Sequence, residues 1–138
     1  AVRLLVVADT HDNLLFFTNR GKVFCVKCHE IPADSSRTAK GMAVINLFPV
    51  ADGERITAMV AVADFRPDDY LLMATYRGEV KKTAADKFAS VRSSGLIAMD
   101  LEAGDELVAV GLATDQSDVI LVTQEGQSIR FAVSTLRA

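Results

Sequence analysis

An apolar run that ends in Thr-x-x-Gly occurs three times along this chain and constrains its fold more than any other feature. The three endings are Thr18–Gly21, Thr75–Gly78 and Thr123–Gly126. A glycine at the last position suits a tight hairpin because it adopts positive φ without steric cost. Successive copies are 57 and 48 residues apart, within or near the period of propeller blades and related sheet arrays. The pattern predicts a surface assembled from repeated antiparallel sheets.

The first two copies are each followed by a second matching segment. In both, an arginine and a nearby glycine precede an apolar stretch, and a turn at 51–55 or 103–106 leads into a last apolar stretch. Residues 4–8 match that last stretch, and the chain ends partway through a third unit. We therefore expect one partial domain over residues 1–138, cut from a longer array. It would hold two complete blades, at 14–63 and 69–113, and a half blade at each end.

Strand signals outnumber helix signals throughout the chain. Residues 14–17, 71–74 and 119–122 are short apolar runs typical of buried inner strands. Thr83–Val91 tolerates a helical turn, but its counterpart in the first repeat contains Ile31-Pro32, so both segments are predicted to be loops. The predicted class is all-β, an array of four-stranded blades with too few blades here to close a propeller.

Basic and acidic residues separate along each repeat, although the net charge is only −3. Segments 52–54, 64–69, 100–106 and 115–118 hold eleven acids against one base, Arg66. Segments 18–29, 35–47, 75–83 and 87–92, in the first halves of the repeats, hold ten bases against one acid, Glu79: Arg20, Lys22, Lys27, Arg37, Lys40, Arg77, Lys81, Lys82, Lys87 and Arg92. Stacked repeats would turn this phase into a basic and an acidic band on different faces. A basic band binds polyanions whatever the total charge, because phosphate contacts are local and screened beyond about 8–10 Å. An ordinary solvated surface is the alternative.

The order of motifs resembles the C-terminal domain of the DNA gyrase A protein, in the bacterial type IIA topoisomerases. The resemblance covers essentially the whole chain and rests on these segments: 16–23, Ile31-Pro32, Arg37-x-x-x-Gly41, Asn46–Pro49, 74–83 and 126–131. It implies a β-pinwheel, a propeller-like disc in which a strand from one blade completes its neighbour. The Gln-Arg-Arg-Gly-Gly-Lys-Gly motif that marks gyrase does not occur here. In the family it lies in an earlier blade, so the corresponding protein of topoisomerase IV stays the alternative parent.

The resemblance also implies that the domain binds and bends duplex DNA around a basic rim and so supports supercoiling. Its partners would be DNA, the rest of the gyrase A protein and the gyrase B protein, within an ATP-dependent parent enzyme. Long side chains just after a hairpin glycine can reach phosphates without burying backbone. The predicted DNA contacts are Arg20, Lys22, Arg37, Lys40, Arg77, Lys81, Lys82, Arg92 and Arg130. A protein-interaction propeller without nucleic acid is the competing function.

Other constellations point to no catalysis and no cofactor. Cys25-Val26-Lys27-Cys28-His29 has the spacing of c-type haem attachment, and zinc held by Cys25, Cys28, His29 and His11 is a second possibility. Alternation along a strand would put the two cysteines on opposite faces, which suits neither group. Asp9–Asp12 is predicted to be a polar turn with a capping aspartate. We therefore predict a non-enzymatic module without metal or cofactor.

Compartment and assembly follow from simpler features. No apolar stretch approaches the ~20 residues of a membrane span, and two cysteines provide no disulfide framework, which favours a reducing cytoplasm. Leu4–Ala8 and Ile129–Leu136 would lack neighbouring strands, and exposed strand edges tend to pair with another chain. We expect a two-fold homodimer formed through these ends.

Overall fold

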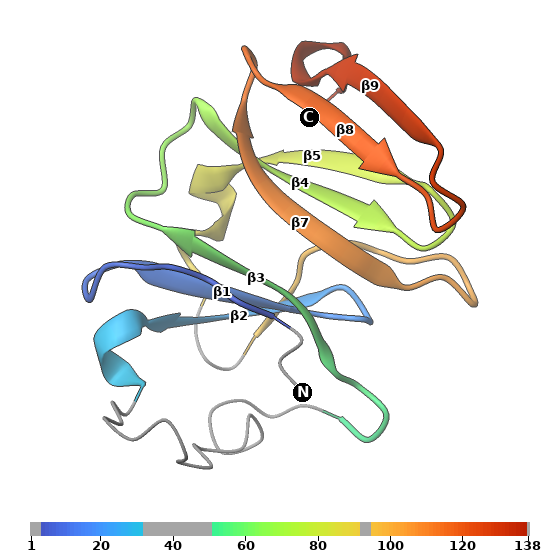
Figure 1. Ribbon diagram of the computed structural model, residues 1–138. Helices are drawn as coiled ribbons and strands as arrows, with labels where there is room; N and C mark the ends of the chain where they lie inside the picture. The colour runs from blue at the N-terminus through green and yellow to red at the C-terminus, as the bar shows by residue number, and fades with distance from the viewer. Residues whose placement is uncertain (1–3, 32–50, 92–94, 138) are drawn as a thin grey trace.

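Three antiparallel β-sheets follow one another along the chain (Figure 1). The structure, a computed structural model, describes residues 4–31, 51–91 and 95–137. The strand orders are β3-β1-β2-β6, β5-β4-β7 and β8-β9. The strands are β1 (Asn13–Thr18), β2 (Lys22–Lys27), β3 (Ile56–Val62), β4 (Asp69–Thr75), β5 (Val80–Ala84), β6 (Leu96–Ile97), β7 (Leu107–Thr114), β8 (Asp118–Val122) and β9 (Ser128–Ala132). The class is all-β, as predicted.

The Thr-x-x-Gly pattern forms the same hairpin three times, between β1 and β2, β4 and β5, and β8 and β9. The glycines have left-handed φ angles: 83° at Gly21, 92° at Gly78 and 86° at Gly126. Each threonine Oγ1 accepts a hydrogen bond from the backbone N–H four residues later, at 3.2 Å from Lys22, 3.1 Å from Glu79 and 3.2 Å from Gln127. The prediction of equivalent hairpins is confirmed, and the threonine has its own role in closing them.

A strand from the second repeat completes the sheet of the first. In β6, Leu96 pairs with Val23 of β2, and Ile97 pairs with Lys22. Next to this pairing, the carbonyl of Gly21 accepts hydrogen bonds from the backbone N–H of Ala98, at 2.8 Å, and of Met99, at 3.2 Å. This exchange is the defining feature of a β-pinwheel. Within the described residues, the first sheet has four strands, the second has three and the third has two.

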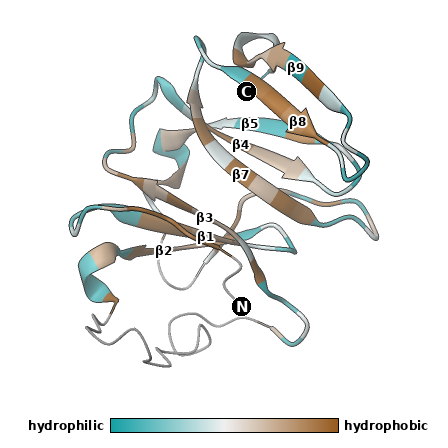
Figure 2. Cartoon of the chain, viewed as in Figure 1, coloured by the Kyte–Doolittle hydropathy of each residue, from teal (hydrophilic) through white to brown (hydrophobic). Residues whose placement is uncertain are grey.

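The main core lies between the first and second sheets. Its largest buried side chains include Phe17 of β1, Leu71 and Met73 of β4, and Leu107 of β7. A second, smaller cluster covers the other face of the first sheet, where Val6 and Ala8 pack against Phe16. Strand β1 is therefore buried on both faces, as its apolar run predicted. Figure 2 shows that hydrophobic residues also dominate β3 and β8.

Strand β8 does not behave as its sequence predicted. Its burial alternates, and Ile120 and Val122 are 65% and 68% exposed. Residues 119–122 were expected to form a buried inner strand, but no described strand covers their outer face. An apolar run is buried on both sides only where sheets lie on both sides of it.

Two short segments also differ from the predictions. The loops predicted after β2 and β5 are 3-10 helices, η1 (Cys28–Glu30) and η3 (Ala85–Phe88), and η4 (Val133–Thr135) follows β9 in the same way. Residues 4–8, expected to be a final strand, form no strand. Within the described ranges, no helix is long and apolar enough to cross a membrane.

The hairpin glycines provide a direct test of the strand exchange. A Cβ on Gly21 would collide with the carbonyl oxygen of Met99, whereas a Cβ on Gly78 would meet nothing within 4 Å. Gly78→Ala should cost about 1–2 kcal/mol from the left-handed backbone alone. Gly21→Ala should cost about 2–5 kcal/mol, because overpacking adds about 1–3 kcal/mol. Urea unfolding of the two variants measures the difference, and equal losses would contradict the close approach at Gly21.

Candidate nucleic-acid interface

The first two hairpin tips each lie against the second turn of their own repeat. Thr18 Oγ1 donates to Glu54 Oε2 at 2.8 Å, and the backbone N–H of Asn19 donates to the carbonyl of Arg55 at 3.0 Å. In the second repeat, the N–H of Tyr76 donates to the carbonyl of Glu106 at 2.8 Å. The repeated sequence thus places a basic tip beside an acidic turn in both cases.

The two tip arginines occupy equivalent positions. Arg20 Nη2 donates to the carbonyl of Asp52 at 3.0 Å. The guanidinium of Arg77 lies so close to the second turn that a Cβ on Gly104 would be 3.0 Å from its Nη2. Both arginines are exposed. The predicted separation of bases and acids onto different faces is therefore wrong at the hairpin tips, where the two signs lie side by side.

In the acidic turn of the second repeat, the pKa of Asp105 is lowered. Partial burial raises the pKa of Asp105, but other contacts outweigh it and lower this pKa below the usual value of 3.8. These contacts are hydrogen bonds from the Thr75 hydroxyl and from the backbone N–H of Glu106 and Arg77, together with the charge of Arg77. The Asp105 carboxylate therefore binds to its own hairpin tip and fixes it.

The adjacent lysines of β5 have different surroundings. Lys81 is exposed, whereas Lys82 is only 5% exposed, and its Nζ donates to Asp115 Oδ1 at 3.1 Å and to the carbonyl of Val133 at 3.4 Å. The prediction that both lysines extend outward from the hairpin is wrong for Lys82, because successive side chains of a strand point to opposite faces.

The other predicted contacts are placed as follows. Lys22 is half-buried, with its Nζ 6.0 Å from the centre of the Phe24 ring. Arg130 is exposed and pairs through Nε with Asp118 Oδ2 at 2.8 Å. An exposed ion pair of this kind contributes about 0–1 kcal/mol, so the guanidinium can exchange the carboxylate for another anion. Arg37, Lys40 and Arg92 lie outside the described residues.

Two further lysines belong with the candidate contacts. Lys27 and Lys87 are exposed, and in the part of the chain that the structure describes neither they nor Lys22 and Lys81 form an ion pair. All four lie on, or just after, the equivalent strands β2 and β5. Lys27 and Lys87 were already among the bases of the charge pattern. They were not predicted to contact DNA, because neither directly follows a hairpin glycine.

The cysteines and histidines of these motifs lie in different surroundings. Cys25 packs against the main core and Cys28 against the second cluster, on opposite faces as predicted. The rings of His11 and His29 meet edge to face with their centres 5.8 Å apart. Across the described ranges, no three side chains of the His, Cys, Asp or Glu type converge on a point where a metal could bind. The Asp9–Asp12 turn is confirmed, since the N–H of Asp9 donates to Asp12 Oδ2 at 2.9 Å.

Antiparallel sheets joined by strand exchange define a β-pinwheel repeat module. A family described as "DNA gyrase C-terminal domain, beta-propeller" matches residues 12–63, 69–114 and 117–138. Because these matches span most of the sequence, the chain belongs to the DNA gyrase C-terminal domain family.

Individual proteins agree with this assignment. The DNA gyrase A protein of Dehalogenimonas lykanthroporepellens is 56% identical over 137 residues, which is 99% of this chain and 17% of that protein. The DNA gyrase A protein of Escherichia coli K12 is 40% identical over 134 residues, 97% of this chain and 15% of that protein. The chain thus spans about a sixth of the length of these relatives.

Solved structures show the same fold. A DNA gyrase A C-terminal domain superposes with a TM-score of 0.76 at 23% identity, covering 94% of this chain and 40% of that one. The C-terminal domain of a DNA topoisomerase IV superposes with a TM-score of 0.75 at 32% identity, covering 89% and 38%.

The lowered pKa of Asp105 predicts an acid-dependent part of the stability. Because this pKa is lower in the folded than in the unfolded chain, the stabilisation is present above the unfolded value of 3.8 and is lost as pH falls through the folded value. Asp105→Asn should therefore be less stable than the parent sequence at pH 6, and the difference should shrink below pH 3.8. Thermal unfolding from pH 7 to about pH 2.5 measures this. A difference that stays constant over the range would contradict the assignment.

Proposed function

We propose that this chain is a duplex-DNA-binding and bending module of a DNA gyrase A protein. It binds DNA along its lysine-bearing strands and supports supercoiling by the strand-passing core of an ATP-dependent type II topoisomerase. It works there with the rest of the gyrase A protein and with the gyrase B protein, in the bacterial cytoplasm. The chain itself supplies no catalytic group and no cofactor.

One observation carries the proposal: four lysines on or just after β2 and β5 form no ion pair with a described carboxylate. In the described residues, Lys22, Lys27, Lys81 and Lys87 have no carboxylate partner, although the chain has an excess of acids. Long side chains of this kind can reach phosphate oxygens while the sheets hold their spacing. Arg20, Arg77 and Arg130 complete the candidate contacts, and Arg37, Lys40 and Arg92 stay predictions from the sequence. Lys82 leaves the set because it is buried.

A protein-interaction module is the second candidate. The net charge of −3 and the exposed apolar side chains Val108 and Leu112 on β7 favour a protein partner. The two functions differ in their salt dependence. The affinity for duplex DNA falls with rising salt, with a slope set by the number of phosphate contacts. Binding to a protein partner through an apolar interface lacks this phosphate-dependent slope.

Lys81→Ala tests the DNA contact. It should weaken binding to duplexes of unrelated sequence equally and reduce the slope of log K against log salt by about 0.9, because one phosphate contact is lost. Fluorescence anisotropy with labelled duplexes at several salt concentrations measures both quantities.

Arg66→Ala is the matched control for Lys81→Ala. It removes one positive charge from an exposed loop where Arg66 already lies 3.6 Å from Asp64, so its salt slope should stay at the parent value. Loss of affinity for one sequence alone, or an equal effect of the two substitutions, would argue against backbone contacts.

We also propose that the chain forms a two-fold homodimer through its apolar ends. Ile120 and Val122 are exposed on the outer face of β8, and Leu5 and Val7 are exposed near the start of the chain. The equivalent side chains of β1, Leu15 and Phe17, are buried in the main core against the second sheet, and those of β4, Leu72 and Ala74, face a groove toward the third sheet. A second copy of the chain can cover the outer face of β8.

Ile120→Glu should shift the homodimer toward monomer by at least about tenfold, because an unpaired carboxylate would be buried in the interface. Tyr76→Glu is the control, since Tyr76 is 75% exposed at the tip of the β4–β5 hairpin and is not part of β8. Light scattering over a concentration series measures the mass of both variants. A parent chain that is monomeric at high concentration would refute the dimer.

A further inference from the structure

Lys82 is the most buried basic side chain in the described residues, and the proposed DNA contacts do not use it. Its ammonium group lies 4.5 Å from the centre of the Tyr70 ring, on the sheet face that both residues share. The Tyr70 hydroxyl in turn donates to Asp115 Oδ2 at 3.4 Å. Lys82, Tyr70 and Asp115 therefore form a closed set of contacts, together with the carbonyl of Val133.

Two of the partners of Lys82 lie outside its own sheet, in the segments that flank the third sheet. Asp115 lies in the turn between β7 and β8, and Val133 begins η4, directly after β9. One ammonium group thus joins the second sheet to both ends of the β8–β9 hairpin. Its neighbour Lys81 makes none of these contacts.

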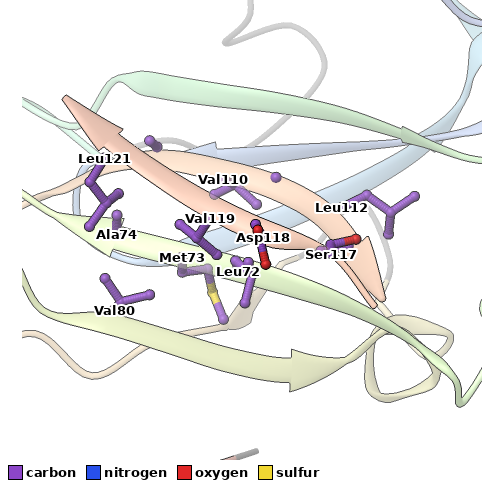
Figure 3. A pocket seen from close by; sticks show the side chains of 13 residues that line it. Leu72, Met73, Ala74, Val80, Val110, Leu112, Ser117, Asp118, Val119 and Leu121 are labelled. Carbon is purple, nitrogen blue, oxygen red and sulfur yellow. The ribbon is translucent and has the colours of Figure 1, made fainter. Parts of the chain in front are cut away.

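The rest of the junction between the second and third sheets is open. A groove of about 370 Å³ lies between them, with Leu72 and Ala74 of β4 on one side and Val119 and Leu121 of β8 on the other (Figure 3). The first and second sheets, by contrast, meet through the buried main core. At the position equivalent to Lys82, the first repeat has Cys25, which packs against that core. One junction is held by apolar packing, and the other depends on a polar contact.

We propose that Lys82 is a positioning residue that sets the angle between the second and third sheets. Buried polar groups that have partners in one arrangement only can favour that arrangement without adding stability. If the chain binds DNA as proposed above, this angle directs the DNA path from Lys81 on the second sheet to Arg130 on the third, and this part rests on the proposed function. The two adjacent lysines thus have different roles: Lys81 contacts the phosphates, and Lys82 orients the next sheet.

The test compares Lys82→Met with Lys81→Met in the whole chain. Each removes one charge and keeps an unbranched side chain, so they differ only in which face of β5 they affect. Spin labels carried by ketone amino acids at Tyr76 and Glu125 report the distance between the hairpin tips of the two sheets. Lys82→Met should broaden the distance distribution about twofold or more, and Lys81→Met should leave it unchanged. A narrow, parent-like distribution in Lys82→Met overturns the proposal, whether or not the chain binds DNA.

DNA affinity, salt slope and DNA bend should also distinguish the two variants. Lys82→Met should keep its affinity within about twofold and keep the parent salt slope, but lose the bend reported by energy transfer between the ends of a labelled duplex. Lys81→Met should keep the bend and lose about 0.9 of the slope. Failure of the parent chain to bind DNA would refute the proposed function, while the spin-label distances would still decide the role of Lys82.

A folding control completes the experiment. Cooperative urea unfolding shows whether Lys82→Met is native, and Lys82→Arg should restore the narrow distribution. If Lys82→Met does not fold, Asp115→Asn removes the charge of the partner instead and should broaden the same distribution. An unchanged distribution in a folded Asp115→Asn overturns the proposal equally.

Discussion

The junction at Gly21 is the constraint on which the arrangement of the first two repeats depends. Its left-handed backbone closes the β1–β2 hairpin, and its carbonyl accepts the N–H groups of Ala98 and Met99. A side chain at this position would collide with the backbone of Met99, so the second repeat can reach the first only where the first has no Cβ. Gly21 thus both closes its hairpin and allows the second repeat to contact the first.

Many basic and acidic side chains of this chain lie side by side in pairs, and not on separate faces of the molecule. The tip arginines lie beside acidic turns, and Arg55 pairs with Glu106 of the next repeat at 2.9 Å. Such pairs position the loops and neutralise much of the positive charge. Lys22, Lys27, Lys81 and Lys87 keep theirs, because no described carboxylate reaches them. A chain with a net negative charge can in this way present local positive potential to a polyanion.

The sequence was sufficient to predict the hairpin turns, because the residues that form each turn are close together in the chain. The threonine and glycine of each hairpin are three residues apart, and positive φ restricts the second position, so the turns could be located directly. Lys82 shows why the rest could not be predicted: its partner Asp115 is 33 residues away, in the turn that leads to the next sheet. Thr18 and Glu54, 36 residues apart, meet for the same kind of reason. The exposure of β8 depends on whether a further sheet covers it, which its own residues do not encode.

Strand exchange also has a consequence for the order of assembly. The three hairpins join residues that are close in the chain, but β6 pairs Leu96 with Val23, which closes a loop of 73 residues. Closing so long a loop costs more chain entropy than closing a hairpin, and contacts of this kind form late. A ribosome makes the chain from its N-terminus, so the first sheet remains one strand short until residue 97 has left the exit tunnel. Completion of the first sheet therefore waits for the synthesis of the second repeat.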